Sequence, residues 1–187
     1  KTESIDVMDA VGSNVRIDAR GNEVLRVLPR LHEGVNEEWI SDKTRFACDG
    51  LSRQRLDQPY IRKADGRLAP TSWQDALALA ADKLKEAGGA KIGAIIGDHA
   101  SVEAMFAMKD LMDGLGSPNL DCRQDGAALD ASVAAAYRFN TTIAGIEEAD
   151  ACLIIGSDPR VEPPILNSRL RKRYLEGGFK IGVVGPN

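Results

Sequence analysis

The chain has 187 residues, with 24 Lys or Arg, 28 Asp or Glu and a formal net charge of −4. Hydrophobic residues make up 43% and charged residues 28%, which excludes a disordered chain or a coiled coil and is typical of a globular fold. A mildly acidic charge gives no support for nucleic-acid binding. No apolar run approaches the roughly 18 residues of a membrane helix, so we expect no membrane insertion. Three scattered cysteines argue against a disulfide framework and favour a reducing compartment.

The first 70 residues carry strand signals and little alanine. Apolar and polar residues alternate over 14–19 and again over 23–28, and Arg20-Gly21-Asn22 between them is typical of a turn. This pattern predicts a β-hairpin. Residues 30–66 are polar and rich in turn signals. We therefore predict a small β-rich subdomain over residues 1–70.

Alternating helices and short apolar strands follow from residue 71, where alanine becomes abundant. Helices are predicted to begin at Ser72, Ser101, Gly126 and Pro163, and strands to span 91–97, 118–121, 151–156 and 180–184. Strands joined through helices imply parallel crossovers, so the fold class predicted for 71–187 is α/β, with a three-layer, mostly parallel sheet and helices on both faces. Its expected core contains Trp73, Leu77, Leu84, Phe106, Leu111, Ile154 and Ile155.

One loop of this α/β part has the features of a ligand site. Gly156, Ser157, Asp158 and Pro159 follow a buried strand and precede a helix, and ligands of parallel α/β sheets lie beyond the carboxyl ends of strands. Glycine permits close backbone approach, and the serine and aspartate offer hydrogen bonds. A tight turn between strand and helix uses the same residue types, so both interpretations stay open.

A basic cluster lies on the last predicted helix. It consists of Arg169, Arg171, Lys172 and Arg173. Most such clusters are solvated faces, helped here by the nearby end of the helix. The alternative is a docking surface for an acidic partner.

Several segments together resemble the molybdopterin-dinucleotide oxidoreductase superfamily. The likeness is carried by residues 41–46 (SDKTRF), 55–77 and 149–159, in the order that the superfamily uses. Residues 2–9, 36–46 and 165–173 are similar, more closely, to the family of the largest iron–sulfur subunits of respiratory complex I, the G chains of NADH–quinone oxidoreductase, in their mitochondrial-type form. The resemblance implies that residues 1–70 correspond to a degenerate iron–sulfur domain and that 71–187 begin a molybdopterin-enzyme-like α/β domain, truncated at its C-terminus.

The sequence departs from the superfamily pattern at the expected cluster ligands. The superfamily places three cysteines before the hairpin and a fourth two residues before Lys-Gly-Arg, and these positions here read Asp6, Asp9, Ser13 and Ser41. Carboxylates and hydroxyls are poor ligands for iron–sulfur clusters. We therefore expect a vestigial cluster site with no metal, and Asp6 and Asp9 as turn or capping residues.

The resemblance implies a scaffold role within complex I. We expect no catalytic residue, only weak vestigial cofactor-binding candidates at 156–159, and no cofactor in this fragment, the iron–sulfur clusters belonging to an N-terminal part of the full subunit. The expected partners are other subunits of the peripheral arm, on the cytoplasmic side of a bacterial inner membrane or the matrix side of the mitochondrial one. The ends of the chain look like cuts through a longer protein, so we also expect self-association. An active molybdopterin oxidoreductase domain resembling formate dehydrogenase, or a nucleotide-binding module without chemistry, are the alternatives.

Overall fold

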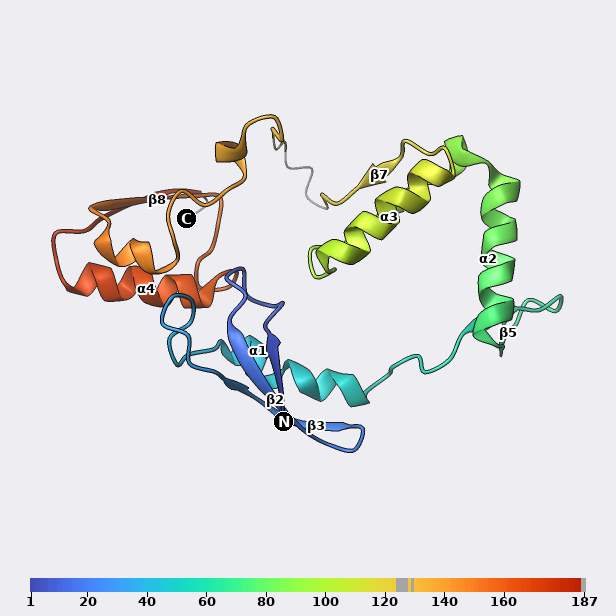
Figure 1. Cartoon of the computed structure of the whole chain (residues 1–187), viewed down its shortest axis with the longest axis horizontal. Helices are drawn as coiled ribbons and strands as arrows, with labels where there is room; N and C mark the ends of the chain where they lie inside the picture. The colour runs from blue at the N-terminus through green and yellow to red at the C-terminus, as the bar shows by residue number, and fades with distance from the viewer. Residues whose placement is uncertain (124–127, 129, 186–187) are drawn as a thin grey trace. The chain divides into compact units, whose positions relative to one another are not determined.

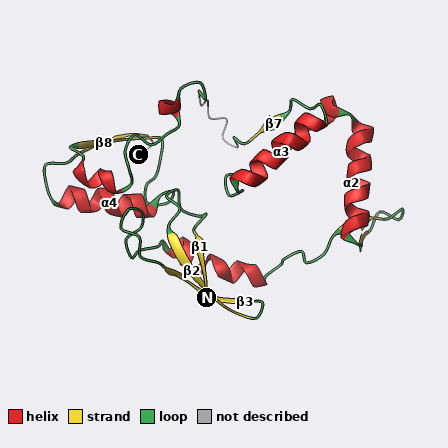
Figure 2. Cartoon of the chain, in the orientation of Figure 1, coloured by secondary structure: helices red, strands yellow, loops and turns green. Residues whose placement is uncertain are grey.

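A computed structural model describes residues 1–123, 128 and 130–185 of the chain (Figure 1). Helices, strands and long loops alternate, so the chain is a mixed α/β protein (Figure 2). The contacts divide it into two compact units. Unit 1 contains residues 1–54 and 130–187, and unit 2 contains residues 55–129. None of the helices in the described part of the chain has the length and hydropathy needed to cross a membrane.

Unit 1 begins with a three-stranded antiparallel sheet. Its strands are β1 (Thr2–Ile5), β2 (Asn14–Arg20) and β3 (Glu23–Pro29), in that order. The predicted hairpin of β2 and β3 is confirmed, and its turn places Gly21 at φ 58°, a conformation that glycine adopts without steric cost. β1 was not predicted, because a four-residue strand in a polar segment has too little alternation to stand out.

The rest of unit 1 contains two further helices and a parallel strand pair. Helix α1 (Asp42–Phe46) follows the sheet, and Ser41 caps it by accepting a hydrogen bond from the N–H group of Thr44. Strands β8 (Ala151–Ile155) and β9 (Lys180–Val184) pair in parallel, and α4 (Pro164–Leu175) connects them. Both strands and this helix lie where the sequence predicts them. Parallel pairing through a helix is the expected βα crossover.

Unit 2 is built from a hairpin, two helices and a second parallel pair. Its elements are β4 (Tyr60–Arg62), β5 (Leu68–Pro70), α2 (Trp73–Ala87), β6 (Ala94–Ile95), α3 (Val102–Gly114) and β7 (Leu120–Asp121). Both helices begin as predicted, after Ser72 and Ser101, each of which accepts a backbone N–H bond at the helix start. The hydroxyl of Ser72 also donates to the carboxylate of Asp75 at 2.8 Å, so the two side chains that the sequence pattern singles out are in contact at the helix start.

Two details of the predicted α/β part differ from the structure. The parallel pairs β6–β7 and β8–β9 are separate two-stranded sheets, so the described residues show parallel pairing without one continuous sheet. The predicted helix from Gly126 is wrong where it can be compared. Residues 124–127 and 129 lie outside the described residues, and residues 130–137 of the predicted helix form a 3-10 turn at Ala134–Ala136 in place of an α-helix.

The cores of unit 1 are small and local. One cluster, of Val15, Val27 and Ile40, lies under the three-stranded sheet. A second, of Ile146, Leu170 and Phe179, lies between α4 and the β8–β9 pair, with Cys152, Ile154 and Leu166 packed against it.

The expected core of the α/β part is largely wrong. Of its members, Ile154 packs against the second cluster and Leu84 is half-buried, whereas the remaining five are exposed: Trp73, Leu77, Phe106, Leu111 and Ile155. The helical spacing of Trp73, Leu77, Phe106 and Leu111 was predicted correctly, but within the part of the chain that the structure describes these side chains stay exposed.

We expect Leu170→Ala to lower the free energy of unfolding by about 2–5 kcal/mol, because the side chain is 5% exposed and its loss leaves a cavity. Leu77→Ala is the matched control. Its side chain is 63% exposed, so it should change stability by no more than about 0.5 kcal/mol. Urea unfolding of both variants measures the difference. Equal losses would mean that α2 is covered as the sequence predicts.

Candidate functional site

The four degenerate cluster positions lie in the loop between β1 and β2 and at the start of α1. The N–H group of Asp6 donates to the carbonyl of Ser13 at 2.8 Å, which continues the antiparallel pairing of β1 and β2. The hydroxyl of Thr44 donates a short hydrogen bond to Asp6 and lies 2.9 Å from the Oγ atom of Ser41. The structure therefore links Asp6, Ser13 and Ser41 in one largely buried polar network through Thr44.

Asp9, the fourth position, ties this loop to helix α4. One carboxylate oxygen accepts the N–H of Val11 at 3.1 Å, and the other accepts the N–H of Ile165 at 3.2 Å. Burial raises the pKa of Asp9, opposed by these two backbone hydrogen bonds. Asp9 and Asp6 each accept the backbone N–H two residues ahead, the hydrogen bond of an Asx turn. The bond to Ile165 is a second role that the turn pattern did not reveal.

These residues do not fit an iron–sulfur cluster. A [4Fe–4S] cluster is held by four thiolates, and Cys48 is the sole cysteine among residues 1–49. Cys48 lines a mostly apolar cavity of about 190 Å³ beside Asp6 and Thr44, but its thiol is directed to the carbonyl of Arg45 at 3.8 Å. Across the described residues, no three His, Cys, Asp or Glu side chains gather as metal ligands. The oxygens of Asp6, Asp9 and Ser41 are engaged in protein hydrogen bonds, whereas the buried hydroxyl of Ser13 has no partner in the described structure.

The predicted ligand loop, residues 156–159, is closed by a residue that the sequence pattern did not single out. Gly156 ends β8 at φ 63°, in the left-handed region. The hydroxyl of Ser157 donates to Glu162 at 2.8 Å, and the N–H of Asp158 donates to the same carboxylate at 3.1 Å. The loop is thus a turn in which the hydroxyl of Ser157 and the N–H of Asp158, the two donors that could bind a ligand, donate to the side chain of Glu162.

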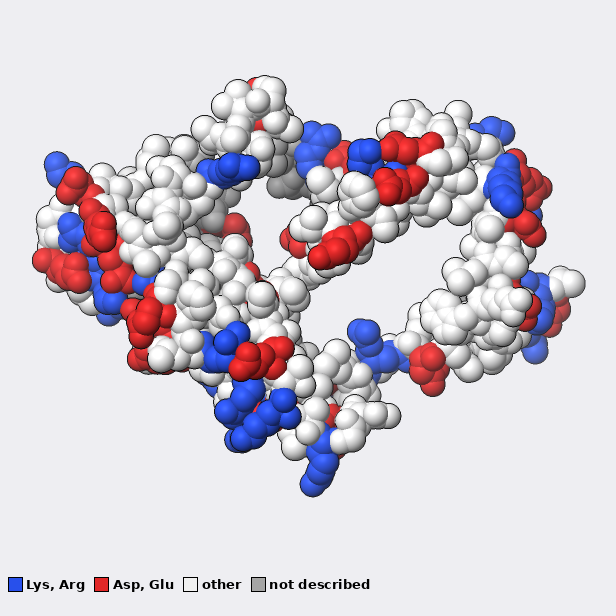
Figure 3. Space-filling model, in the orientation of Figure 1, with Lys and Arg blue, Asp and Glu red and all other residues white. Residues whose placement is uncertain are grey.

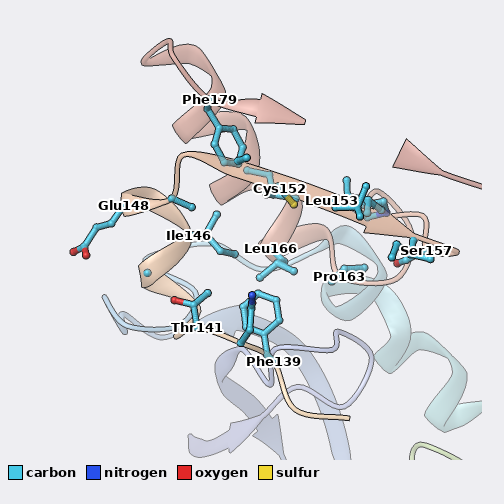
Figure 4. Close-up of a pocket in the computed structure, with 18 residues that line it drawn as sticks. Phe139, Thr141, Ile146, Glu148, Cys152, Leu153, Ser157, Pro163, Leu166 and Phe179 are labelled. Atoms are coloured by element: carbon cyan, nitrogen blue, oxygen red, sulfur yellow. The ribbon is translucent and has the colours of Figure 1, made fainter. Parts of the chain in front are cut away.

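A cavity of about 550 Å³ lies beside this loop (Figure 4). Ser157 and Pro159 line it, together with apolar side chains of β8, α4 and the segment before β8, among them Cys152 and Leu166. Polar side chains of that segment, Thr141 and Glu148, line it as well (Figure 4). Burial raises the pKa of the Cys152 thiol, so it stays protonated at neutral pH. A wall of apolar and polar side chains can enclose a ligand, but the protonated thiol of Cys152 is not an activated nucleophile for covalent catalysis.

The basic cluster on α4 is neither a solvated face nor an open docking surface at its centre. Arg169 is 3% exposed and donates to the carbonyls of Glu33 and Val35 and to the carboxylate of Glu147. Lys172 bonds the carboxylates of Glu37 and Glu147, each at 2.8 Å. The acidic partners of Arg169 and Lys172 are therefore Glu37 and Glu147 of this chain.

This salt-bridge cluster, defined as Glu37, Glu147, Arg169 and Lys172, is electrically balanced. Blue and red atoms lie next to each other in the region of α4 (Figure 3). Burial raises the pKa of Glu147, but the hydrogen bonds from Lys172 and Arg169 outweigh burial and hold this pKa below its ordinary range. The same bonds from Glu147 and Glu37 raise the pKa of Lys172. Glu147 and Lys172 therefore both stay charged at neutral pH.

A buried asparagine stabilises the segment 33–37, to which Arg169 donates its hydrogen bonds. Asn36 is fully buried and accepts the N–H of Asn14 at 2.9 Å. Its amide donates to the carbonyls of Arg30 and Trp39, each at 3.1 Å. The neighbouring Glu37 adopts φ 49°, a left-handed conformation uncommon for glutamate. These bonds fix the backbone that presents Glu37 to α4.

Two family models together match almost the whole chain. Residues 55–187 match "Molybdopterin oxidoreductase", and residues 1–49 match the "NADH-ubiquinone oxidoreductase NDSU1/NuoG-like, 4Fe-4S domain". The chain therefore belongs to the molybdopterin oxidoreductase family. Its homologues are complex I subunits of the G type.

The curated relatives align with nearly the whole chain. The chain is 51% identical over 185 residues to "NADH dehydrogenase [ubiquinone] iron-sulfur protein 1, mitochondrial" of Solanum tuberosum, covering 99% of this chain and 25% of that protein. It is 53% identical over 184 residues to the G-type subunits of NADH-quinone oxidoreductase from Rickettsia conorii and from Rickettsia bellii, covering 98% of this chain and 27% of each. The chain spans about a quarter of the length of these relatives.

Sequence reasoning missed the burial of Arg169, although a signal was present. Arg169 lies four residues after Ile165 and next to Leu170, so it shares the buried face of α4. The exposed neighbour Arg171 points elsewhere on the helix. No comparable signal marks Thr44 or Glu162, because their partners are set by loop geometry.

Arg169→Ala should lower the free energy of unfolding by about 3–5 kcal/mol, because Glu147 loses its buried partner and two carbonyls lose their donors. Arg171→Ala, an exposed arginine on the same helix, should change it by at most about 0.5 kcal/mol. Denaturant unfolding measures both. Equal effects would show that the salt-bridge cluster does not hold unit 1 together.

The pH dependence of stability should also report this cluster. A carboxyl group whose pKa is lower in the folded state stabilises the fold above its unfolded pKa, and this contribution is lost as pH falls through the folded pKa. Below the ordinary value of 4.5, the wild type should therefore lose stability more steeply than Glu147→Gln. Asp9, whose raised pKa acts in the opposite direction, is common to both proteins and cancels. Parallel unfolding curves from neutral pH to about pH 3 would contradict the assignment.

Proposed function

We propose that this chain is a scaffold segment of a complex I subunit, in a complex that transfers electrons from NADH to quinone coupled to ion translocation. It carries no redox centre and no catalytic residue of its own. The names of the relatives support the assignment to an NADH–quinone oxidoreductase. One observation carries the scaffold role: oxygen side chains stand at the four cluster positions, and the structure uses three of them in hydrogen bonds that support the fold.

The match of residues 1–49 to a 4Fe-4S domain raises the opposite expectation, that this stretch holds a cluster. The donor set argues against it, since a single thiol cannot replace four thiolates. We propose that the cluster of the domain is held by a preceding part of the full subunit. Residues 1–49 then support a neighbouring cluster without ligating it.

The two alternatives receive less support. An active molybdopterin enzyme would supply redox chemistry at a bound molybdenum, and the candidates to hold such a cofactor are Gly156, Ser157, Asp158 and Pro159. The Ser157 hydroxyl and the Asp158 N–H donate to the carboxylate of Glu162. A loop that holds this carboxylate does not fit an anionic dinucleotide. The same contacts disfavour a nucleotide-binding module at this loop. The complex I relatives favour the scaffold role over both.

The domain division, the partners and the location follow from the same proposal. Residues 1–70 form the degenerate iron–sulfur subdomain, and residues 71–187 form an α/β domain whose parallel pairs belong to one three-layer sheet in the full subunit. The partners are other subunits of the peripheral arm. The subunit lies at the cytoplasmic side of a bacterial inner membrane or at the matrix side of the mitochondrial one.

After anaerobic reconstitution with iron and sulfide, we expect the 187-residue chain to hold no stoichiometric iron and to show no iron–sulfur absorbance. The reason is the absence of thiolates at Asp6, Asp9, Ser13 and Ser41. Iron analysis and visible absorbance measure this directly. Cys48→Ser serves as the matched control and should behave like the wild type. About four irons per chain, lost in Cys48→Ser, would refute the scaffold proposal.

We also expect this chain to self-associate as its concentration rises. Apolar side chains on one face of the β8–β9 pair are exposed, among them Leu153, Ile155 and Val184. Parallel sheets are normally covered on both faces, and exposed apolar patches promote association. Sedimentation equilibrium over a wide concentration range tests this, with Leu153→Lys expected to shift the equilibrium towards monomer. A monomer at all concentrations would contradict the expectation.

A further inference from the structure

We propose that Glu162 is a built-in anion that occupies the loop at the end of β8 and blocks it against anionic ligands. The inference deepens the proposed function and rests on it, because it gives a physical reason why this domain holds no phosphate-bearing cofactor. It concerns residues 156–162 of unit 1.

Both oxygens of the Glu162 carboxylate are used at this loop. Oε2 accepts the hydroxyl of Ser157 at 2.8 Å, and Oε1 accepts the N–H of Asp158 at 3.1 Å. One hydroxyl and one backbone N–H that converge on two oxygens of an anion form the arrangement that binds phosphate groups in proteins. Here the two oxygens belong to the chain itself.

The backbone turn fixes this contact. The N–H groups of Val161 and Glu162 donate to the carbonyl of Asp158 at 3.1 and 2.9 Å. The carboxylate of Asp158 accepts the N–H of Arg160 at 2.9 Å. These bonds close a short turn that returns residue 162 to the start of the loop. Glu162 therefore reaches Ser157 through the local fold.

A positive charge already lies at this turn. The Nζ atom of Lys43, from α1, donates to the carbonyl of Val161 at 2.7 Å. A cation beside two hydrogen-bond donors at the carboxyl end of a parallel strand is favourable for an anion. Glu162 supplies that anion at no loss of translational freedom, so an external phosphate must compete with an intramolecular group.

The loop lies within residues 55–187, which match the molybdopterin oxidoreductase family. A dinucleotide cofactor presents phosphates, which need free donors. The Ser157 hydroxyl and the Asp158 N–H are not free donors while Glu162 is bound. The family match and the contacts of this loop therefore disagree, and Glu162 accounts for the disagreement.

The test is a titration with pyrophosphate, followed through the backbone amide signals of Ser157 and Asp158 in NMR spectra of the 187-residue chain. Glu162→Ala should bind pyrophosphate at least tenfold more tightly than the wild type. Glu176→Ala removes the same charge from a site outside the loop and should behave like the wild type. Adding Ser157→Ala to Glu162→Ala should reverse the gain.

Glu162→Gln keeps the length of the side chain and carries the test if the alanine variant does not fold. It should show a smaller gain, since a neutral amide holds the two donors less strongly. If neither variant gains affinity and the wild type does not bind, the blocking role is wrong while the scaffold proposal stands. If the wild type binds as tightly as the variants, both the blocking role and the argument against a nucleotide site fail.

Discussion

The buried guanidinium of Arg169 is the interaction on which unit 1 depends. It connects α4 to the backbone of Glu33 and Val35 and to the carboxylate of Glu147, three segments far apart in the sequence. Removing an arginine from water is unfavourable by several kcal/mol, and only a full set of partners offsets this cost. The partners are the two carbonyls and the carboxylates of Glu147 and Glu37. This interaction specifies one arrangement of residues 1–54 and 130–187.

The loop between β1 and β2, which contains Asp6, Asp9 and Ser13, is also bound to α4 and to the segment before it. Asp9 reaches the amide of Ile165 at the start of α4, and Lys43 reaches the carbonyl of Val161 just before it. Asp6 and Thr44 close the loop from the other side. A metal cluster cross-links the loops that ligate it, and here hydrogen bonds made by side chains, to the backbone and to each other, connect these segments. Oxygen ligands that are unsuitable for iron and sulfur are well suited to this role.

Local elements of this fold follow from the sequence, whereas its long-range contacts do not. The β2–β3 hairpin, the serine-capped starts of α2 and α3, and the β8 and β9 strands were predictable, because turn residues, caps and apolar runs act over a few residues. The core was not, since helical spacing identifies an apolar face without saying what covers it. For this reason the sequence predicted a buried face of α2 at Trp73 and Leu77, and the structure shows both side chains exposed.

The candidate site shows the same division. The four cluster positions and the loop at 156–159 could be located from spacing and from family resemblance. Their partners could not, because Thr44 bonds Asp6 across 38 residues and Ile165 bonds Asp9 across 156. Arg169 lies between these cases. Its position on the buried face of α4 could be predicted from the sequence, but its acceptors include the backbone carbonyls of Glu33 and Val35, which no side-chain pattern reveals.

Native-state hydrogen exchange tests the central claim most directly, that residues 1–54 and 130–187 form one cooperative unit joined by Arg169. The amides of β2 and of α4 are compared between the wild type and Arg169→Ala. The account predicts that protection falls by a similar factor in both elements, since each depends on the same interaction. Loss of protection in α4 with unchanged protection in β2 would contradict it.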